Sequence, residues 1–126
     1  MRKVTVLVVD DDPAIVGLLV DALESEGYHV LATIDGQAVP LARDMQPDVI
    51  LLDLMMPGMD GVAVSQRLRS DPSTATIPII AMSAQHRLHA TAALMPFNDR
   101  LAKPFDLATL YATVARWTTT SSSTAP

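Results

Sequence analysis

The sequence predicts a doubly wound α/β fold, in which a five-stranded parallel sheet carries helices on both faces. Two observations lead to this prediction. Short runs of β-branched and aliphatic residues alternate five times with helical apolar patterns, and the connections between them are short. The runs are also nearly continuous in apolar residues, which is typical of strands buried on both faces. A length of 126 residues suits one domain with its own core.

The first half of the chain begins with the run Val4–Val9, which predicts a buried strand. A helix follows, with Asp12 as its N-cap, Pro13 at its first position and an end near Gly27. The next predicted elements, in order, are a strand at Tyr28–Ala32, a weak helical pattern at Gln37–Met45 and a strand at Asp48–Asp53.

In the second half, proline and glycine predict a loop at Met55–Gly61. The elements expected after it are a helix from Val62 to near Asp71, a strand at Ile77–Met82, a helix at His86–Leu94, a short strand at Leu101–Ala102 and a helix at Asp106–Trp117. The tail, Thr118–Pro126, is rich in Ser and Thr and has no apolar periodicity, so it is predicted to be disordered.

Composition narrows the class of protein. The net charge of −5 argues against a nucleic-acid-binding surface. Because the chain has no cysteine, disulfides and thiolate metal sites are excluded. No signal peptide and no apolar stretch of membrane-spanning length is recognisable, so a cytoplasmic protein without membrane contact is expected.

Polar residues follow the predicted strands at the edge where such folds bind ligands. Asp10–Asp12 come after the first strand, Asp53 ends the third, Ser83 follows the fourth and Lys103 follows the fifth. In doubly wound folds the site lies beyond the carboxyl ends of the strands, so these side chains are expected to meet on one rim. Taken alone, Asp10–Asp12 could be no more than an acidic helix-capping turn.

The types of these residues favour phosphoryl chemistry. Carboxylates without nearby His or Cys suit Mg²⁺, which prefers oxygen ligands and retains several waters. Lys103 offers a point charge for a phosphate oxygen, and Ser83 offers a hydrogen bond. Asp53, alone on its strand end, is the candidate nucleophile that would carry an acyl phosphate.

Four motifs in order, at compatible spacings, make the chain similar to the receiver domain of two-component response regulators. They are Val8-Val9-Asp10-Asp11-Asp12-Pro13, the segment Asp53–Gly61, Ser83-Ala84 and Lys103-Pro104-Phe105. The resemblance runs from about Lys3 to Trp117, so residues 1–117 are expected to form the receiver domain and 118–126 the tail. It implies the strand order 2-1-3-4-5 and a single-domain phosphorelay protein.

The resemblance also implies a role for each site residue. Asp53 would be phosphorylated and would help to bind Mg²⁺. Asp11 would ligate the metal directly, Asp10 mainly through bound water, and Met55 through its backbone carbonyl. Ser83 and Lys103 would bind the phosphoryl group, with a cis bond between Lys103 and Pro104. The phosphodonor would be a phosphohistidine on a sensor histidine kinase or phosphotransfer protein, and the downstream target another protein.

Three features depart from the family pattern or qualify it. Arg100 stands where receivers carry a switch aromatic residue, and its charged head cannot reproduce an apolar rotamer change. The segment between Ser83 and Lys103 is shorter than usual, so the helix within it is expected to be short or displaced. Met55 and Gln85, at the family positions that influence hydrolysis, are not acids that position water, which predicts slow self-dephosphorylation and no conventional turnover.

Other functions fit the residues less well. A phosphohydrolase of the haloacid-dehalogenase type would need Thr or Val at position 14, where Ala14 stands, and a larger chain with a cap. A pseudo-receiver that only binds proteins is opposed by the retained Asp11, Asp53, Ser83 and Lys103, although Arg100 mildly favours it. An FMN-binding flavodoxin is disfavoured because the first loop offers carboxylates where a phosphate needs N–H groups.

Overall fold

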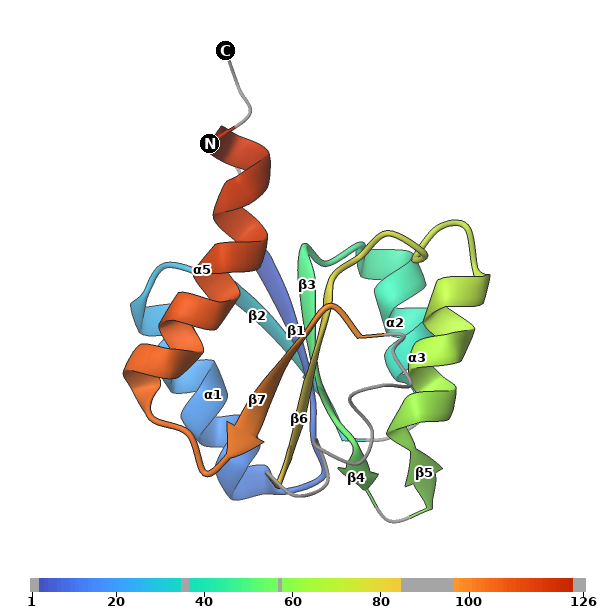
Figure 1. Cartoon of the computed structure of the whole chain (residues 1–126), viewed down its shortest axis with the longest axis horizontal. Coiled ribbons are helices and arrows are strands. Elements are labelled where there is room, and N and C mark those ends of the chain that lie inside the picture. Colours follow the sequence, from blue (N-terminus) through green and yellow to red (C-terminus); the bar gives the residue numbers. More distant parts are fainter. Residues whose placement is uncertain (1–2, 35–36, 57, 85–96, 124–126) are drawn as a thin grey trace.

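The computed structural model describes residues 3–34, 37–56, 58–84 and 97–123, and it confirms the predicted fold class. Five strands form one parallel sheet in the order β2-β1-β3-β6-β7 (Figure 1). Because β6 and β7 are the fourth and fifth strands of this sheet, the order is the expected 2-1-3-4-5. The strands are β1 (Thr5–Val9), β2 (His29–Thr33), β3 (Val49–Asp53), β6 (Ile79–Ala84) and β7 (Asp99–Lys103).

Helices cover both faces of the sheet, as the apolar strands require. On one face lie α1 (Pro13–Ser25) and α5 (Leu107–Ser123), and on the other lie α2 (Ala38–Met45) and α3 (Gly61–Ser70) (Figure 1). All five residues of the central strand β3 are buried. No helix in the described part of the chain combines the length and the apolar character that crossing a membrane requires.

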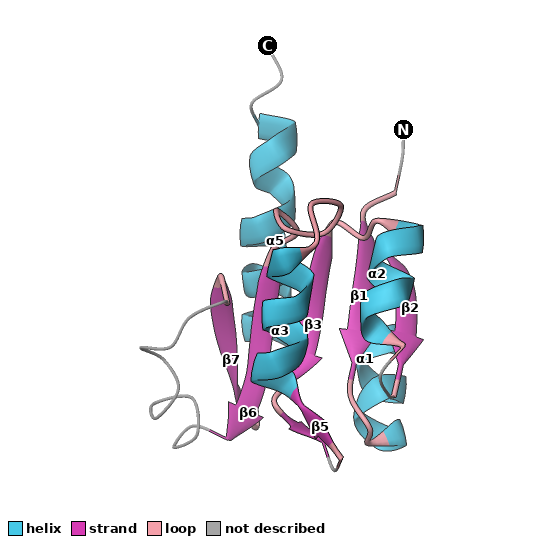
Figure 2. Ribbon diagram, turned by 90° about the vertical axis from the view of Figure 1, so that its right-hand side faces the viewer, coloured by secondary structure: helices cyan, strands magenta, loops and turns pink. Residues whose placement is uncertain are grey.

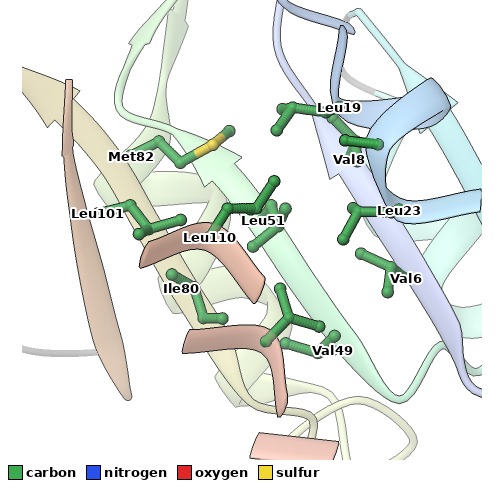
Figure 3. Close-up of a cluster of buried hydrophobic side chains, with 12 residues drawn as sticks. Val6, Val8, Leu19, Leu23, Val49, Leu51, Ile80, Met82, Leu101 and Leu110 are labelled. Atoms are coloured by element: carbon green, nitrogen blue, oxygen red, sulfur yellow. The ribbon is translucent and has the colours of Figure 1, made fainter. Parts of the chain in front are cut away.

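Successive side chains of the central strands point to opposite faces of the sheet, so the core has two layers. Val6 and Val8 of β1 and Leu51 of β3 face α1 and α5, where Leu23 and Leu110 pack against them (Figure 3). Their neighbours in sequence, including Leu7, Val9, Ile50 and Leu52, face α2 and α3. Each such buried aliphatic side chain contributes about 1.5–3 kcal/mol, so the two layers stabilise the sheet that positions the site.

Two carboxylates start the helices that flank the acidic edge. The Asp12 side chain accepts a hydrogen bond from the Ala14 amide at 2.9 Å, which confirms its predicted capping role at the start of α1. Asp60 caps α3 in the same way through the Val62 amide, also at 2.9 Å. Satisfying these amides fixes the first turn of each helix beside the carboxyl ends of β1 and β3.

The middle of the chain differs from the prediction in two places. The expected loop after β3 contains a short antiparallel pair, β4 (Met55–Met56) and β5 (Met59–Asp60). The fourth strand of the sheet is Ile79–Ala84, later than the expected Ile77–Met82, and Ser83 therefore lies inside it. Pro78 has no amide proton for a strand ladder, although its carbonyl accepts from the Ile50 amide at 2.9 Å. The helix expected at His86–Leu94 lies outside the described residues.

The last helix is longer than predicted. Because apolar periodicity stops there, the helix was predicted to end at Trp117, with a disordered tail from Thr118. In the structure α5 continues to Ser123. Thr118 is buried, and its hydroxyl donates to the Val114 carbonyl at 2.9 Å. A threonine hydroxyl that donates to the carbonyl of the preceding turn is compatible with a helix, but it leaves no apolar pattern in the sequence. The end of the helix was therefore predicted too early.

We expect Gly61→Ala to destabilise the protein by about 1–3 kcal/mol, because the new methyl would overpack a backbone contact. A Cβ at Gly61 would lie 2.7 Å from Leu54 Cα and 3.0 Å from the Asp53 carbonyl oxygen. Gly17→Ala is the matched control, since nothing lies within 4 Å of its Cβ and a helical alanine gains up to about 1 kcal/mol. Urea denaturation measures both changes, and equal effects of the two substitutions would contradict the expectation.

Candidate functional site

The predicted site residues meet at the carboxyl edge of the sheet. Figure 2 shows the arrowheads of β1, β2, β3 and β6 pointing to one edge, where β1 ends just before Asp10 and β3 ends at Asp53. The registers place Asp53 opposite Met82 and Lys103 opposite Ala84, so these strands end nearly level. Parallel pairing thereby brings residues from distant parts of the chain onto one rim.

Asp10, Asp11 and Asp53 form a tight acidic cluster. One carboxylate oxygen from each lies within 4.8 Å of those of the other two. Asp10 is fully buried and Asp53 is 4% exposed, whereas Asp11 is more open to solvent. Two like charges about 4 Å apart near a protein surface repel by about 4 kcal/mol, so the cluster requires a nearby cation.

Lys103 supplies part of that positive charge. Its ammonium nitrogen lies 2.9 Å from Asp10 Oδ2 and 3.6 Å from Asp53 Oδ2. Burial alone would lower the pKa of Lys103, but the hydrogen bond to Asp10 and the charge of Asp53 outweigh it and raise that pKa. The bond between Lys103 and Pro104 is cis, as expected. One ammonium therefore faces a cluster with more than one carboxylate.

The Asp53 carboxyl group is poised for a cation or an electrophile. Burial raises its pKa, the Met55 amide lowers it through a 3.0 Å bond to Oδ1, and the Asp10 charge raises it again. Lys103 opposes this, and the pKa remains above the ordinary value of 3.8. An ionised carboxylate held at such a cost is typical of groups that bind a metal or react.

Ser83 presents an unsatisfied hydroxyl at the same edge. It follows Met82, which pairs with Asp53 at the end of β3, and it is 1% exposed. Ser83 Oγ has no hydrogen-bond partner among the residues that the structure describes. Leaving a buried hydroxyl without a partner costs about 1–3 kcal/mol. Such a group fits a ligand that brings oxygen atoms to the site.

These residues fit Mg²⁺. The cluster offers only carboxylate oxygens from Asp10, Asp11 and Asp53, which are the ligands that this hard cation prefers. A metal held by so few protein groups keeps positions for water or a phosphoryl oxygen. For Met55 the structure gives the amide bond to Asp53, and the ligand role of its carbonyl stays a prediction.

Sequence reasoning missed the backbone part of the site. The amide of Met55 orients Asp53, and the amide of Asp12 donates to Asp10 Oδ1 at 3.0 Å. The available signal was the turn that must follow each strand, since an aspartate there accepts from the amide two residues on. Arg100, the departure noted in the sequence, is exposed.

Fold and site together define a class of α/β proteins in which acidic side chains gather at the carboxyl edge of a parallel sheet, in an arrangement that suits a divalent cation. The response regulator receiver domain family matches residues 6–115 of the chain. The chain therefore belongs to the family of response regulator receiver domains.

Curated relatives agree with this assignment. Protein PilH of Pseudomonas aeruginosa is 37% identical over 112 residues, which covers 86% of this chain and 93% of PilH. The DNA-binding dual master transcriptional regulator RpaA of Synechocystis is 42% identical and the response regulator PleD of Caulobacter vibrioides 41% identical, each over 86% of this chain. The chain spans 46% of RpaA and 25% of PleD, so it corresponds to a part of each.

Solved structures of receiver domains superpose closely. The receiver domain of a sensor histidine kinase from Pseudomonas aeruginosa, which has a magnesium ion coordinated in the active site cleft, has a TM-score of 0.84. It is 33% identical, with 92% of this chain and 98% of that chain covered. The chemotaxis protein CheY4 of Vibrio cholerae has a TM-score of 0.82 at 28% identity, with 92% and 99% covered.

Proposed function

We propose that this receiver domain accepts a phosphoryl group on Asp53 from a phosphohistidine of a sensor histidine kinase or phosphotransfer protein. The convergence of Asp53 with Asp10, Lys103 and the unpartnered Ser83 hydroxyl carries the proposal. Membership of the response regulator receiver family supports it. The acyl phosphate then changes the contacts of the domain with a downstream protein.

Each side chain has a part in the transfer. An Asp53 oxygen attacks phosphorus as the phosphorus–nitrogen bond of phosphohistidine breaks, and the bonding electrons return to the imidazole ring. Lys103 pairs with a phosphoryl oxygen, and the Ser83 hydroxyl donates to another. Asp10, Asp11 and Asp53 would hold Mg²⁺, which would supply charge neutralisation for the phosphoryl oxygens.

The direct test is intact-mass measurement after incubation with Mg²⁺ and acetyl phosphate. The wild type is expected to gain the mass of one phosphoryl group, and Asp53→Ala to gain none, because the nucleophile is absent. Asp12→Asn is the matched control, since asparagine also caps helices and Asp12 bonds to Ala14. An adduct that persists in Asp53→Ala, or steady hydrolysis of unrelated phosphomonoesters, would contradict the proposal.

The same spectra followed over time report the lifetime of the acyl phosphate. The Met55 side chain is 50% exposed and has no acid or base that could activate water. Slow hydrolysis, over minutes or longer, is therefore expected, and a lifetime of seconds would contradict it. Gln85, the second residue on which this expectation depends, lies outside the described residues.

An apolar cavity beside the site supports a protein as the phosphodonor. The cavity, of about 330 Å³, is lined by Ile15, Leu18, Leu19, Lys103, Pro104 and Phe105. Lys103 borders both the cavity and the acidic cluster, so a partner that brings a histidine to Asp53 also covers the cavity. Leu18 is 52% exposed there and offers a contact for an apolar side chain of that partner.

Leu18→Gln is expected to slow phosphotransfer from a protein donor about tenfold, which corresponds to the loss of roughly 1.4 kcal/mol of binding. Phosphorylation by acetyl phosphate should be unchanged, because a small donor does not use the cavity. Met45→Gln on α2 is the matched control, since Met45 is similarly exposed at 49%. Initial rates with both donors measure the effect, and equal slowing with acetyl phosphate would contradict it.

A further inference from the structure

A groove between α2 and α3 carries positive charge on an otherwise acidic protein. Its volume is about 560 Å³, and its lining includes Arg43 of α2 with Ala63, Arg67 and Ser70 of α3. Each arginine stands in the last turn of its helix, and both are exposed. Because the chain has a net charge of −5, two guanidinium groups on one groove form a local region of opposite sign. We call this surface the arginine groove.

Neither guanidinium group is fully used within the described part of the chain. Arg43 binds Oδ2 of Asp71 through its Nε atom at 2.9 Å, which leaves its two Nη nitrogens for another acceptor. Asp71, which also lines the groove, is occupied by this bond and by Ser73, whose amide and hydroxyl donate to Oδ1. The Arg67 guanidinium has no hydrogen-bond or ion-pair partner among the described residues. With one carboxylate against two guanidinium groups, the groove keeps donors that suit a further carboxylate.

A second surface has the opposite charge. Asp21 and Glu24 stand in the last turns of α1 and Glu26 caps its carboxyl end, and all three are exposed. The sequence of α1 contains no lysine or arginine, and none of these carboxylates has a cationic partner among the residues that the structure describes. They face the negative pole of the helix dipole, and Asp21 and Glu24, three residues apart, also repel each other. We call these three residues the acidic end of α1, which a cation from outside the helix would stabilise.

The geometry points to contact between two copies of the chain, in which the acidic end of α1 of one copy lies in the arginine groove of the other. The groove follows α3 from Ala63 to Ser70, about 10 Å at 1.5 Å per residue, which matches two turns of a helix. Both residues are small, which leaves room for the side chains of a docked helix. Asp21 and Glu24 lie on one helical face, as two guanidinium groups on one groove require.

The two surfaces lie on opposite faces of the sheet, because α1 packs on one face and α2 and α3 pack on the other (Figure 1). A molecule therefore cannot fill its own groove, and the contact joins different surfaces of the two copies. Such a head-to-tail contact leaves a free groove on one copy and a free α1 on the other, so further copies add in the same way.

The alternative occupant is an acidic helix of another protein, in which case this chain stays monomeric. The acidic end of α1 favours a second copy, because it supplies the complementary charge and spacing within the same molecule. Exposed ion pairs each contribute little and are screened by salt. The expected association is therefore weak, and it disappears at high ionic strength.

Sedimentation equilibrium of the full chain at about 1 mM, without a phosphodonor, tests the contact. At about 0.1 M salt, where charges act over about 10 Å, the weight-average mass is expected to exceed the monomer mass. At about 1 M salt, where charges act over about 3 Å, it should fall to the monomer mass. A monomer mass at both salt concentrations overturns the inference, and so does a larger mass that salt does not lower.

Two charge-reversal variants test whether both surfaces take part. Arg67→Glu gives the groove a negative charge, and Asp21→Lys together with Glu24→Lys makes the end of α1 basic, so each variant alone should associate about tenfold more weakly. Mixed in equal amounts they should associate again, since each acidic surface then meets a basic one. Arg100→Glu is the matched control, with the same change of charge at an exposed position of β7, and it should keep the association. No restoration in the mixture, or an equal loss in Arg100→Glu, overturns the inference.

Dilution of the ¹⁵N-labelled wild type gives an answer that does not depend on the folding of any variant. Amide resonances of the last turns of α1, and of α2 and α3 beside the groove, are expected to move together as the protein is diluted at the lower salt concentration. Movement at one of the two surfaces alone, or only elsewhere in the molecule, overturns the inference.

Discussion

Asp53→Asn is expected to raise the unfolding free energy of the metal-free protein by about 1 kcal/mol at neutral pH, while it abolishes phosphorylation. Asp53 is 4% exposed and lies in a cluster with the buried Asp10 and the more open Asp11. Lys103 is the cation that contacts this cluster among the described residues. Removing one carboxylate charge relieves repulsion and burial cost. The residue that gives the domain its function thus lowers its stability when no metal is bound.

The pH dependence follows from the raised pKa of Asp53. In the unfolded chain this carboxyl ionises at about its ordinary value of 3.8, and in the folded protein it ionises only at higher pH. The free energy of unfolding of the wild type is therefore lower than that of Asp53→Asn at pH values above the folded pKa of Asp53. This difference in stability becomes smaller as the pH falls through that pKa toward 3.8. Urea denaturation of both proteins at a series of pH values, with a chelator present, measures this difference in stability.

Mg²⁺ should make the wild type more stable than Asp53→Asn. A ligand at a hundred times its dissociation constant stabilises the folded state by about 2.7 kcal/mol, and Asp53→Asn loses part of that gain with one of its oxygen ligands. Asp44→Asn, on the exposed surface of α2, is the control and should change stability by less than about 0.5 kcal/mol. Equal stability of wild type and Asp53→Asn at every pH, with and without Mg²⁺, would refute this account.

Lys103→Met is expected to lower the unfolding free energy of the metal-free protein by about 2 kcal/mol. Removing one partner of a buried ion pair typically costs 3–5 kcal/mol, and the cost is smaller here because the Lys103 side chain is 26% exposed. The methionine keeps most of the apolar stem but leaves Asp10 and Asp53 without the ammonium. Stability measured by urea denaturation reports the loss.

The Lys103 contribution also has a defined pH range. Because the folded pKa of Lys103 lies above its ordinary value of 10.5, its stabilising effect is complete below 10.5 and disappears as the pH rises through the folded pKa. Mg²⁺ should restore part of the stability of Lys103→Met, since it neutralises the same carboxylates. Arg67→Met, at an exposed position of α3, is the control, and an equally large loss there would contradict the explanation.

Local patterns were enough to predict most of the architecture. The apolar runs around Val8 and Leu51 predicted buried strands because both faces of the sheet are covered, and Asp12 with Pro13 marked a helix start because capping depends on adjacent residues. The β4–β5 pair, the start of β6 after Pro78 and the continuation of α5 past Trp117 were missed. Each depends on backbone or hydroxyl hydrogen bonds that apolar periodicity does not record.

By itself, the sequence determined the fold class and the chemistry at the strand ends, because parallel strands must bring their carboxyl ends to one edge. Tertiary structure alone decided that Ser83 is buried without a hydrogen-bond partner in the described part of the chain, and that Lys103 lies closer to Asp10 than to Asp53. It also brought Asp99 to Trp117, across 18 positions of sequence. Such contacts depend on how helices and strands pack, and no local preference of the residues encodes them.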